Sequence, residues 1–225
     1  MRQEFQTFKL TYTLIFLNLL VYLPAALFSA DIVSMDTRVL VALGALYGPL
    51  VFGYDEWWRL LSAMFLHGGM THLLMNMFSL YIVGRPTEIY FSKYSYLAIY
   101  FFSGLIGAVA SLTVHPESVG IGASGAIFGL FGALTGFFIV HRERKGTQSK
   151  VFMKNVGVII ALNVFLGLTI PAIDMSAHAA GFMTGLTGGM ILSKKPGWAI
   201  AYSVAMLIVL GSSVFYLQGL YASVL

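Results

Sequence analysis

Long apolar stretches dominate this 225-residue sequence and constrain its fold more than any other feature. A helix needs about 20 mostly apolar residues to cross the hydrocarbon core of a bilayer. Polar or small residues interrupt the second, fifth and sixth stretches, so we expect those three helices to face protein rather than lipid. The seven predicted spans are Leu10–Phe28, Gly69–Tyr90, Tyr94–Val114, Ser124–Val140, Val156–Ile170, Ser176–Leu192 and Trp198–Gln218.

The composition indicates that most of this chain is in contact with lipid. Charged residues make up 10% of it and hydrophobic residues 58%, whereas a soluble domain carries about 25% charged residues. The first stretch is longer than the apolar region of a signal peptide, about 7–15 residues, so we interpret it as a retained span. The sequence contains no cysteine, which excludes disulfides and cysteine-ligated metal sites. We therefore predict an all-α, polytopic bundle of transmembrane helices.

The basic residues predict how this bundle is oriented. Of the 13 lysines and arginines, only Arg38 and Arg59 fall in connections on one side, and the other eleven fall on the opposite side. The positive-inside rule places the larger group in the cytoplasm. We therefore expect a cytoplasmic N-terminus and an extracytoplasmic C-terminus in a bacterial cell membrane, and no nucleic-acid partner. The eleven are Arg2, Lys9, Arg85, Lys93, Arg142, Arg144, Lys145, Lys150, Lys154, Lys194 and Lys195.

The connection from Ser29 to Gly68 is long and not plainly polar. Its segments Val39–Leu43 and Trp57–Leu61 are amphipathic or interfacial in character. Adjacent tryptophan and arginine side chains suit the headgroup region of a bilayer, where a ring and a charge each find a partner. We expect short helices that lie partly in the outer leaflet, and no separate soluble domain.

A glycine-rich segment, Gly120–Ala126, follows an outside loop and opens the fourth predicted span. Ser124 stands where that helix begins, beside unsatisfied backbone N–H groups and the positive end of the helix dipole. Both features favour an alkoxide or a nearby oxyanion. The alternative is a serine that only caps a close-packed helix. The glycines of its packing face are Gly125, Gly129, Gly132 and Gly136.

A histidine begins the sixth predicted span. His178 shares a helix face with Gly181 and Gly185, at spacings of three and four residues. A histidine within a span costs free energy, and the small residues beside it allow close approach to a neighbouring helix. The side chain is therefore a candidate catalytic base, or a structural group that hydrogen-bonds across the bundle.

The second predicted span carries His72 and Asn76 one turn apart on one face. The imidazole N–H and the amide N–H₂ are suitable donors to a developing oxyanion. Interhelical hydrogen bonding is again the alternative. His67 lies five residues before His72, which is not the spacing of a zinc-binding helix, and no acid stands between them.

Two acids lie close to these groups. Glu88, near the cytoplasmic end of the second span, could reach water or pair with Arg85 or Lys93. Asp174, four residues before His178, could be a third catalytic residue, but a solvated surface position is the expectation we favour.

The predicted topology brings the polar groups to one depth. Ser124, His178 and the His72–Asn76 pair each lie near the outer end of their span, a turn or so below the surface at about 1.5 Å per residue. A nucleophile, a base and oxyanion donors at one depth meet the geometric demands of acyl transfer. Each group taken alone has a structural explanation. That all of these groups should lie at one depth by chance is much less expected.

In these residues and their order, the chain resembles the rhomboid family of intramembrane serine proteases. The resemblance extends from Trp58 to Leu192, and no single element is specific without the others. Its elements are Trp58-Arg59, His67, His72-x-x-x-Asn76, Gly122-x-Ser124-Gly125 and Ala177-His178-x-x-Gly181-x-x-x-Gly185.

The resemblance implies a dyad of Ser124 and His178 that works without an acid, and neither metal nor cofactor. It also implies an oxyanion hole made by Asn76, His72 and the Ser124 backbone N–H. This site would lie in a water-filled cavity open to the outer side of the membrane.

The resemblance also implies roles for residues away from the dyad. Glu88 would hold the bundle together, and the Trp58-Arg59 loop would be structural. Residues 1–195 would form a six-span core, and residues 196–225 an additional C-terminal transmembrane helix, an arrangement called "6+1".

Two positions depart from the family pattern. Pro86 lies within the second span, where it removes a helical hydrogen bond. Phe128 stands one turn after the serine, where many members carry a tyrosine that stacks on the catalytic histidine. A phenylalanine can stack there but cannot donate a hydrogen bond, and neither departure removes a catalytic group.

The resulting hypothesis is an intramembrane serine endopeptidase that cleaves in or near the transmembrane segments of single-span proteins, through an acyl-enzyme. Its partners would be these substrates and the lipid bilayer. Two other classes stay open. A transporter or channel would use the histidines and asparagine to line an ion path, although no acid lies among the deep polar residues. An inactive rhomboid-like protein would bind helices without cutting them, although such proteins typically lack the serine or the histidine.

Overall fold

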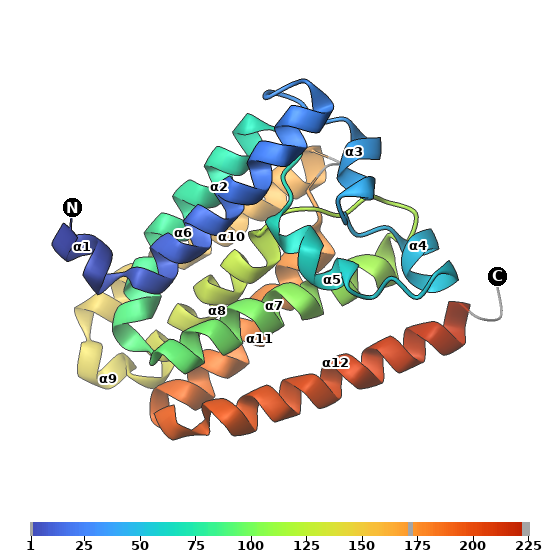
Figure 1. Ribbon diagram of the computed structural model, residues 1–225. Helices are drawn as coiled ribbons and strands as arrows, with labels where there is room; N and C mark the ends of the chain where they lie inside the picture. The colour runs from blue at the N-terminus through green and yellow to red at the C-terminus, as the bar shows by residue number, and fades with distance from the viewer. Residues whose placement is uncertain (1, 171–172, 222–225) are drawn as a thin grey trace.

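The computed structural model describes residues 2–170 and 173–221, and this part of the chain is all-helical (Figure 1). Each of the seven predicted spans forms one long helix, which confirms the all-α prediction. The long helices are α2 (Lys9–Ser29), α6 (Met70–Tyr90), α7 (Lys93–Val114), α8 (Ser124–Val140), α10 (Thr147–Thr169), α11 (Met175–Lys194) and α12 (Ala199–Tyr221). By length and composition, four of them, α2, α7, α10 and α12 with the turn before it, could cross a membrane.

Short helices occupy the ends and connections of the bundle. Four of them lie between Ser29 and Gly68, as predicted, while their depth in a bilayer stays a prediction. An isolated bridge between Leu46 and Gly120 ties this connection to the segment before α8, with N–H···O distances of 2.9 and 2.8 Å. The short helices are α1 (Arg2–Thr7), α3 (Thr37–Ala42), α4 (Gly48–Gly53), α5 (Arg59–Ser62), η1 (Ala63–Phe65), α9 (Arg142–Lys145) and η2 (Pro196–Trp198).

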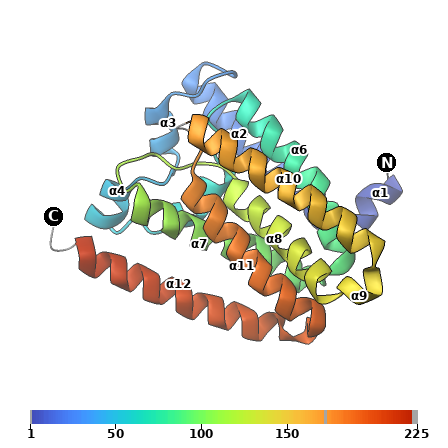
Figure 2. The ribbon, with the colours of Figure 1, turned by 180° about the vertical axis from the view of Figure 1, so that it is seen from behind.

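The centre of the bundle is the contact between α8 and α11, which lie side by side with α7 against them (Figure 2). The glycine faces predicted on these two helices meet backbone to backbone. A Cβ at Gly185 would overlap the carbonyl oxygen of Gly129, and a Cβ at Gly181 would overlap that of Gly125. Only glycine allows an approach this close. The same small residues therefore bring the first turns of both helices together.

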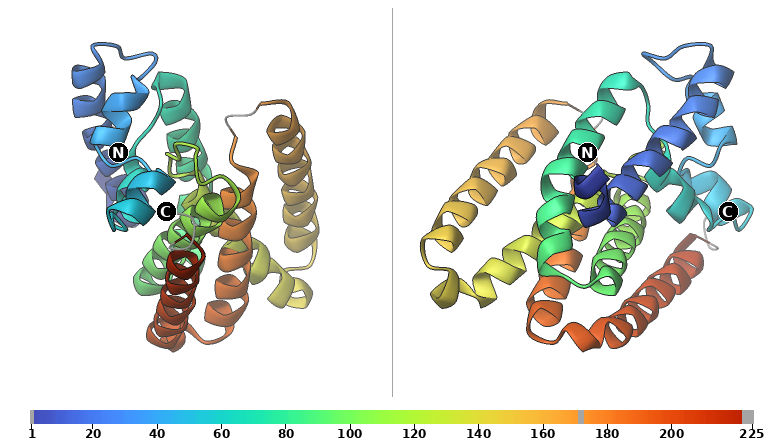
Figure 3. Two further views of the ribbon diagram at one scale, coloured as in Figure 1. Left: turned by 90° about the vertical axis from the view of Figure 1, so that its right-hand side faces the viewer. Right: turned by 60° about the vertical axis from the view of Figure 1, so that its left-hand side comes forward.

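Helix α10 stands at the edge of the bundle (Figure 3). Only 6% of its apolar window is buried, compared with 50% for α7. The prediction that the fifth span faces protein is therefore wrong. Its side chains Phe165 and Leu168 are exposed by 63% and 83%, while one polar residue that interrupts the stretch, Asn163, faces the bundle. The helix also begins at Thr147, nine residues earlier than predicted.

The buried guanidinium of Arg59 organises the connection between α2 and α6. It forms an ion pair with Glu56 at 2.6 Å and donates to the carbonyls of Val41 and Ala45 at 2.7 and 2.9 Å. Trp58 is half exposed, and its ring lies over the Cα of Gly44, where a Cβ would collide with it. Both residues thus make contacts within this connection.

Glu88 of α6 accepts hydrogen bonds from the first turn of α2. Its carboxylate receives the N–H groups of Leu10 and Thr11 at 2.9 and 3.0 Å and the Thr11 hydroxyl at 2.9 Å. Free N–H groups at a helix start need such an acceptor. Arg85, which we weighed as a partner for Glu88, instead pairs with Glu4 at 3.0 Å. Helix α6 continues through Pro86 to Tyr90.

Replacing Glu88 by alanine is expected to destabilise the fold by about 2–3 kcal/mol, because three part-buried donors on α2 lose a charged acceptor. Unfolding of the purified protein in detergent, followed by circular dichroism, measures this loss. Glu143→Ala removes an exposed acid of α9 and is the matched control. Equal unfolding midpoints for the two variants would contradict the structural role of Glu88.

Candidate active site

Ser124 is the first residue of α8 and is partly exposed. The turn before it places Gly122 at φ +115°, a backbone conformation that glycine adopts readily. The Gly122 N–H donates to the carbonyl of Ala63 at 2.9 Å, which fixes the turn against η1. The serine hydroxyl therefore stands at a helix N-terminus whose entry is held by the preceding loop.

His72 of α6 lies across this turn. A Cβ at Gly122 would lie 2.9 Å from His72 Nε2 and 3.9 Å from Ser124 Oγ, so both atoms border the same small space. The backbone N–H of Gly68 donates to His72 Nδ1 at 3.4 Å. In a neutral ring that accepts at Nδ1, the proton is on Nε2. His72 can therefore present an N–H towards the space beside the serine.

Asn76 lies one turn further along α6 and is buried. One N–H of its amide donates to the carbonyl of His72 at 3.0 Å. A side-chain amide has a second N–H, which could donate to another acceptor. His67 is also buried, and its ring packs edge-to-face on that of His72 at 5.0 Å between centroids. The packing of His67 therefore constrains the orientation of the imidazole of His72.

His178 occupies the first turn of α11 and is buried. The ring of Phe128, one turn after Ser124, stacks on it at 4.4 Å with an interplanar angle of 14°. A Cβ at Gly125 would lie 3.6 Å from the carbonyl oxygen of Ala177. The residues that flank the serine and the histidine are thus in direct contact.

A residue that sequence reasoning missed also contacts this histidine. Asn163 of α10 places its amide Nδ2 at 3.2 Å and its Oδ1 at 3.4 Å from His178 Nδ1. The available signal was a lone asparagine in an otherwise apolar stretch, where a polar group usually has a partner.

Asp174 is the N-cap of α11 rather than a solvated surface residue. Its carboxylate accepts from the Ala177 N–H at 3.0 Å and from the Ser176 hydroxyl at 2.5 Å. Burial by itself raises the pKa of Asp174, but hydrogen bonds from Ser111 and Ser176 outweigh it and hold the pKa below its usual range. The acid therefore positions the first turn of α11, which carries His178.

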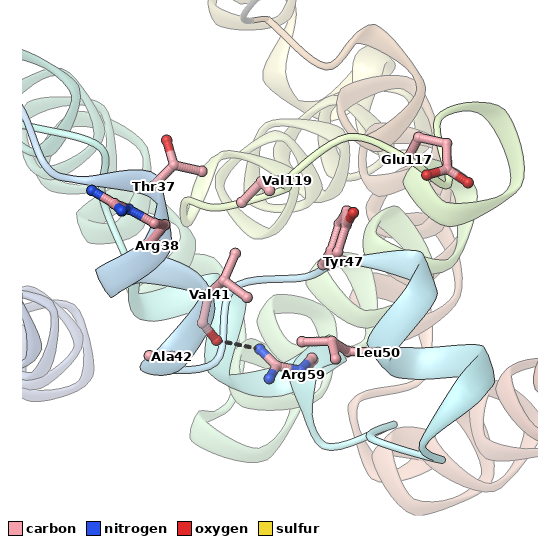
Figure 4. A pocket seen from close by; sticks show the side chains of 9 residues that line it. All are labelled: Thr37, Arg38, Val41, Ala42, Tyr47, Leu50, Arg59, Glu117 and Val119. Carbon is pink, nitrogen blue, oxygen red and sulfur yellow. Dashed lines mark hydrogen bonds between the residues drawn. The ribbon is translucent and has the colours of Figure 1, made fainter.

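An open pocket of about 530 Å³ lies between the α3–α5 connection and the loop that precedes α8 (Figure 4). Its lining includes Arg38, Tyr47 and Glu117, and the guanidinium of Arg59 donates to the Val41 carbonyl at its floor. None of the polar groups around Ser124 lines it. The water-filled cavity expected at the serine stays a prediction.

Fold and site together define a polytopic helical membrane protein with a serine and histidines gathered at adjoining helix starts. A family model described as "Rhomboid domain" matches residues 54–195. The chain belongs to the rhomboid family. The match ends just before η2 and α12.

Curated relatives agree with this assignment. The chain is 34% identical over 219 residues to "Rhomboid protease GluP" of Bacillus subtilis, which covers 94% of this chain and 41% of that protein. It is 38% identical to "RHOMBOID-like protein 2" of Arabidopsis thaliana, covering 72% and 51% of the two chains. It is 35% identical to "Putative rhomboid protease YdcA" of Bacillus subtilis, covering 66% and 74%. The chain spans about half or less of the length of the first two relatives.

Proposed function

We propose that this chain is an intramembrane serine endopeptidase in which Ser124 is the nucleophile and His178 the base. The observation that carries the proposal is the contact between the first turns of α8 and α11, where Phe128 stacks on His178 and Gly125 meets Ala177. Two relatives named as rhomboid proteases support the same activity. The helix N-terminus at Ser124 adds backbone N–H groups that favour negative charge.

The proposed reaction proceeds through an acyl-enzyme. Neutral His178 takes the proton of the Ser124 hydroxyl as its oxygen attacks the scissile carbonyl carbon. The tetrahedral intermediate collapses, the C–N bond breaks, and protonated His178 gives its proton to the leaving amine. Water then attacks the ester with His178 again as base, which releases the carboxylate and restores the hydroxyl.

The oxyanion would be held by His72 Nε2–H, the second amide N–H of Asn76 and the Ser124 backbone N–H. The first of these faces the space that also borders Ser124 Oγ. In the resting structure one amide N–H of Asn76 donates to the His72 carbonyl. The other N–H is the one proposed to bind the oxyanion. Such donors act chiefly in the transition state, where negative charge develops on the oxygen.

Replacing Asn76 by alanine is expected to lower kcat by about 10²–10³-fold, the usual effect of losing one oxyanion donor. The change in KM should be small, because the donor acts mainly on the transition state. Steady-state cleavage of a fluorogenic single-span substrate measures both parameters. Asn155→Ala, on the exposed face of α10, is the control. An increase in KM with kcat unchanged in Asn76→Ala would argue against the assigned role.

The proposed substrates are single-span membrane proteins with an unwound or small-residue stretch near the outer membrane face, because a helical peptide bond hides its carbonyl in the helix ladder. The proposed location is a cell membrane, with a cytoplasmic N-terminus and the site open to the extracytoplasmic side, as the positive-inside rule indicates. The proposed architecture is a six-span core over residues 1–195 and an added transmembrane helix over 196–225.

The decisive experiment compares purified wild type with Ser124→Ala after reconstitution into liposomes that contain a single-span substrate with helix-destabilising residues. A fluorophosphonate probe is applied to the same samples. Cleavage and labelling by the wild type alone are expected. A wild type that neither cleaves nor is labelled would favour an inactive helix-binding relative or a transporter and would overturn the proposal.

A further inference from the structure

We propose that Asn163 of α10 is a positioning residue for His178, and this rests on the proposed function. Its amide nitrogen and oxygen lie 3.2 and 3.4 Å from His178 Nδ1. The ring is held from two sides, because Phe128 stacks on its face while Asn163 reaches its edge. Asn163 thus holds the Nδ1 edge of the ring and offers that nitrogen a hydrogen-bond partner.

The chemistry of the base decides the direction of this hydrogen bond. To accept the serine proton, neutral His178 must have a free lone pair on one nitrogen and a proton on the other. With Nε2 as the base, the proton is on Nδ1 and needs an acceptor. The amide oxygen of Asn163 is such an acceptor, and rotating the amide by 180° places it where the nitrogen now stands, at 3.2 Å.

The same contact gains strength during the reaction. When His178 takes the proton of Ser124, the ring becomes a cation and its Nδ1–H donates more strongly to the amide oxygen. Hydrogen bonds to a charged group are worth more than those between neutral groups. Asn163 would therefore stabilise the charged intermediate more than the resting enzyme, which is the requirement for an effect on kcat.

The position of Asn163 in the fold supports a role beyond general packing. Helix α10 is largely exposed, yet this side chain turns inwards and is only partly exposed. A second contact, from the Ser149 hydroxyl to the Phe138 carbonyl at 3.3 Å, holds the other end of α10 to α8. Attachment of the helix therefore does not depend on Asn163 alone.

The test compares Asn163→Leu, which has nearly the same shape without the polar atoms, with Asn163→Asp, which keeps an acceptor oxygen in place. Asn155→Leu is the matched control on the exposed face of the same helix. We expect Asn163→Leu to lower kcat by about 10–100-fold with little change in KM, the range for losing a hydrogen bond to a charged group. Asn163→Asp should retain kcat within a few-fold, and Asn155→Leu should match the wild type.

A second readout separates positioning from a merely structural contribution. Labelling by a fluorophosphonate forms a bond between Ser124 Oγ and phosphorus, expels fluoride and transfers the hydroxyl proton to His178. Its rate should fall in Asn163→Leu by the same factor as kcat, with an unchanged unfolding midpoint. Wild-type labelling rates in Asn163→Leu would overturn the role of Asn163 and leave the proposed function standing. Absence of labelling in the wild type would instead overturn the proposed function, and this inference with it.

Discussion

Replacing either Ser124 or His178 by alanine is expected to lower kcat/KM for a single-span substrate by about 10⁴–10⁶-fold. The serine supplies the attacking oxygen and the histidine accepts its proton. The two residues act as a unit, so neither contributes to catalysis without the other. The variant that lacks both should therefore be no slower than either single variant. Cleavage rates of the three proteins in liposomes, with wild type alongside, test this non-additivity directly.

Matched controls for this prediction lie in the loop before α8. Ser118 and His115 are exposed residues of the same types near the same end of the bundle, so Ser118→Ala and His115→Ala should cleave at wild-type rates. Losses that multiply in the double variant would show that the two groups act independently. That result would contradict the proposed dyad, as would full activity of Ser124→Ala.

The elements of this site that could be predicted from the sequence are those set by local pattern. Helix α8 begins at Ser124, as expected from the glycine-rich turn before an apolar stretch. The spacing of Gly181 and Gly185 predicted a smooth face on α11, and the structure packs this face on the backbone of α8. Periodicity determines which side chains share a helix face, so such contacts follow once two smooth faces exist.

Contacts that depend on tertiary placement escaped prediction. Asn163 and His178 are 15 residues apart on different helices, and no spacing rule links them. For Glu88 the residues alone suggested water or a basic neighbour, and the resemblance implied a role in holding the bundle together, but neither indicated its partner, the N-terminus of α2, 77 and 78 residues away. Asp174 was predictable in principle, because an acid directly before an apolar helix is a common N-cap. The outward orientation of α10 was not predictable. Polar residues in an apolar stretch indicate that a helix has a polar partner, but they do not indicate how much of the helix is buried.

Replacing Gly185 by alanine is expected to have the largest structural effect, a loss of about 3 kcal/mol or more in the free energy of unfolding. The added Cβ would overlap the Gly129 carbonyl oxygen and lie 2.5 Å from its carbon. These are backbone atoms of α8, which cannot turn aside as a flexible side chain would. The two helices must separate, so the prediction is a lower unfolding midpoint in detergent, measured by circular dichroism.

The same substitution connects helix packing with catalysis. Separation of α8 from α11 would weaken the stacking of Phe128 on His178, so Gly185→Ala should also lose cleavage under conditions in which it is still folded. Gly211→Ala on α12 is the control, because a Cβ there meets open space, and it should be neutral or slightly stabilising since alanine favours a helix over glycine. A Gly185→Ala protein as stable and active as Gly211→Ala would mean that the close contact between these helices holds neither the fold nor the site.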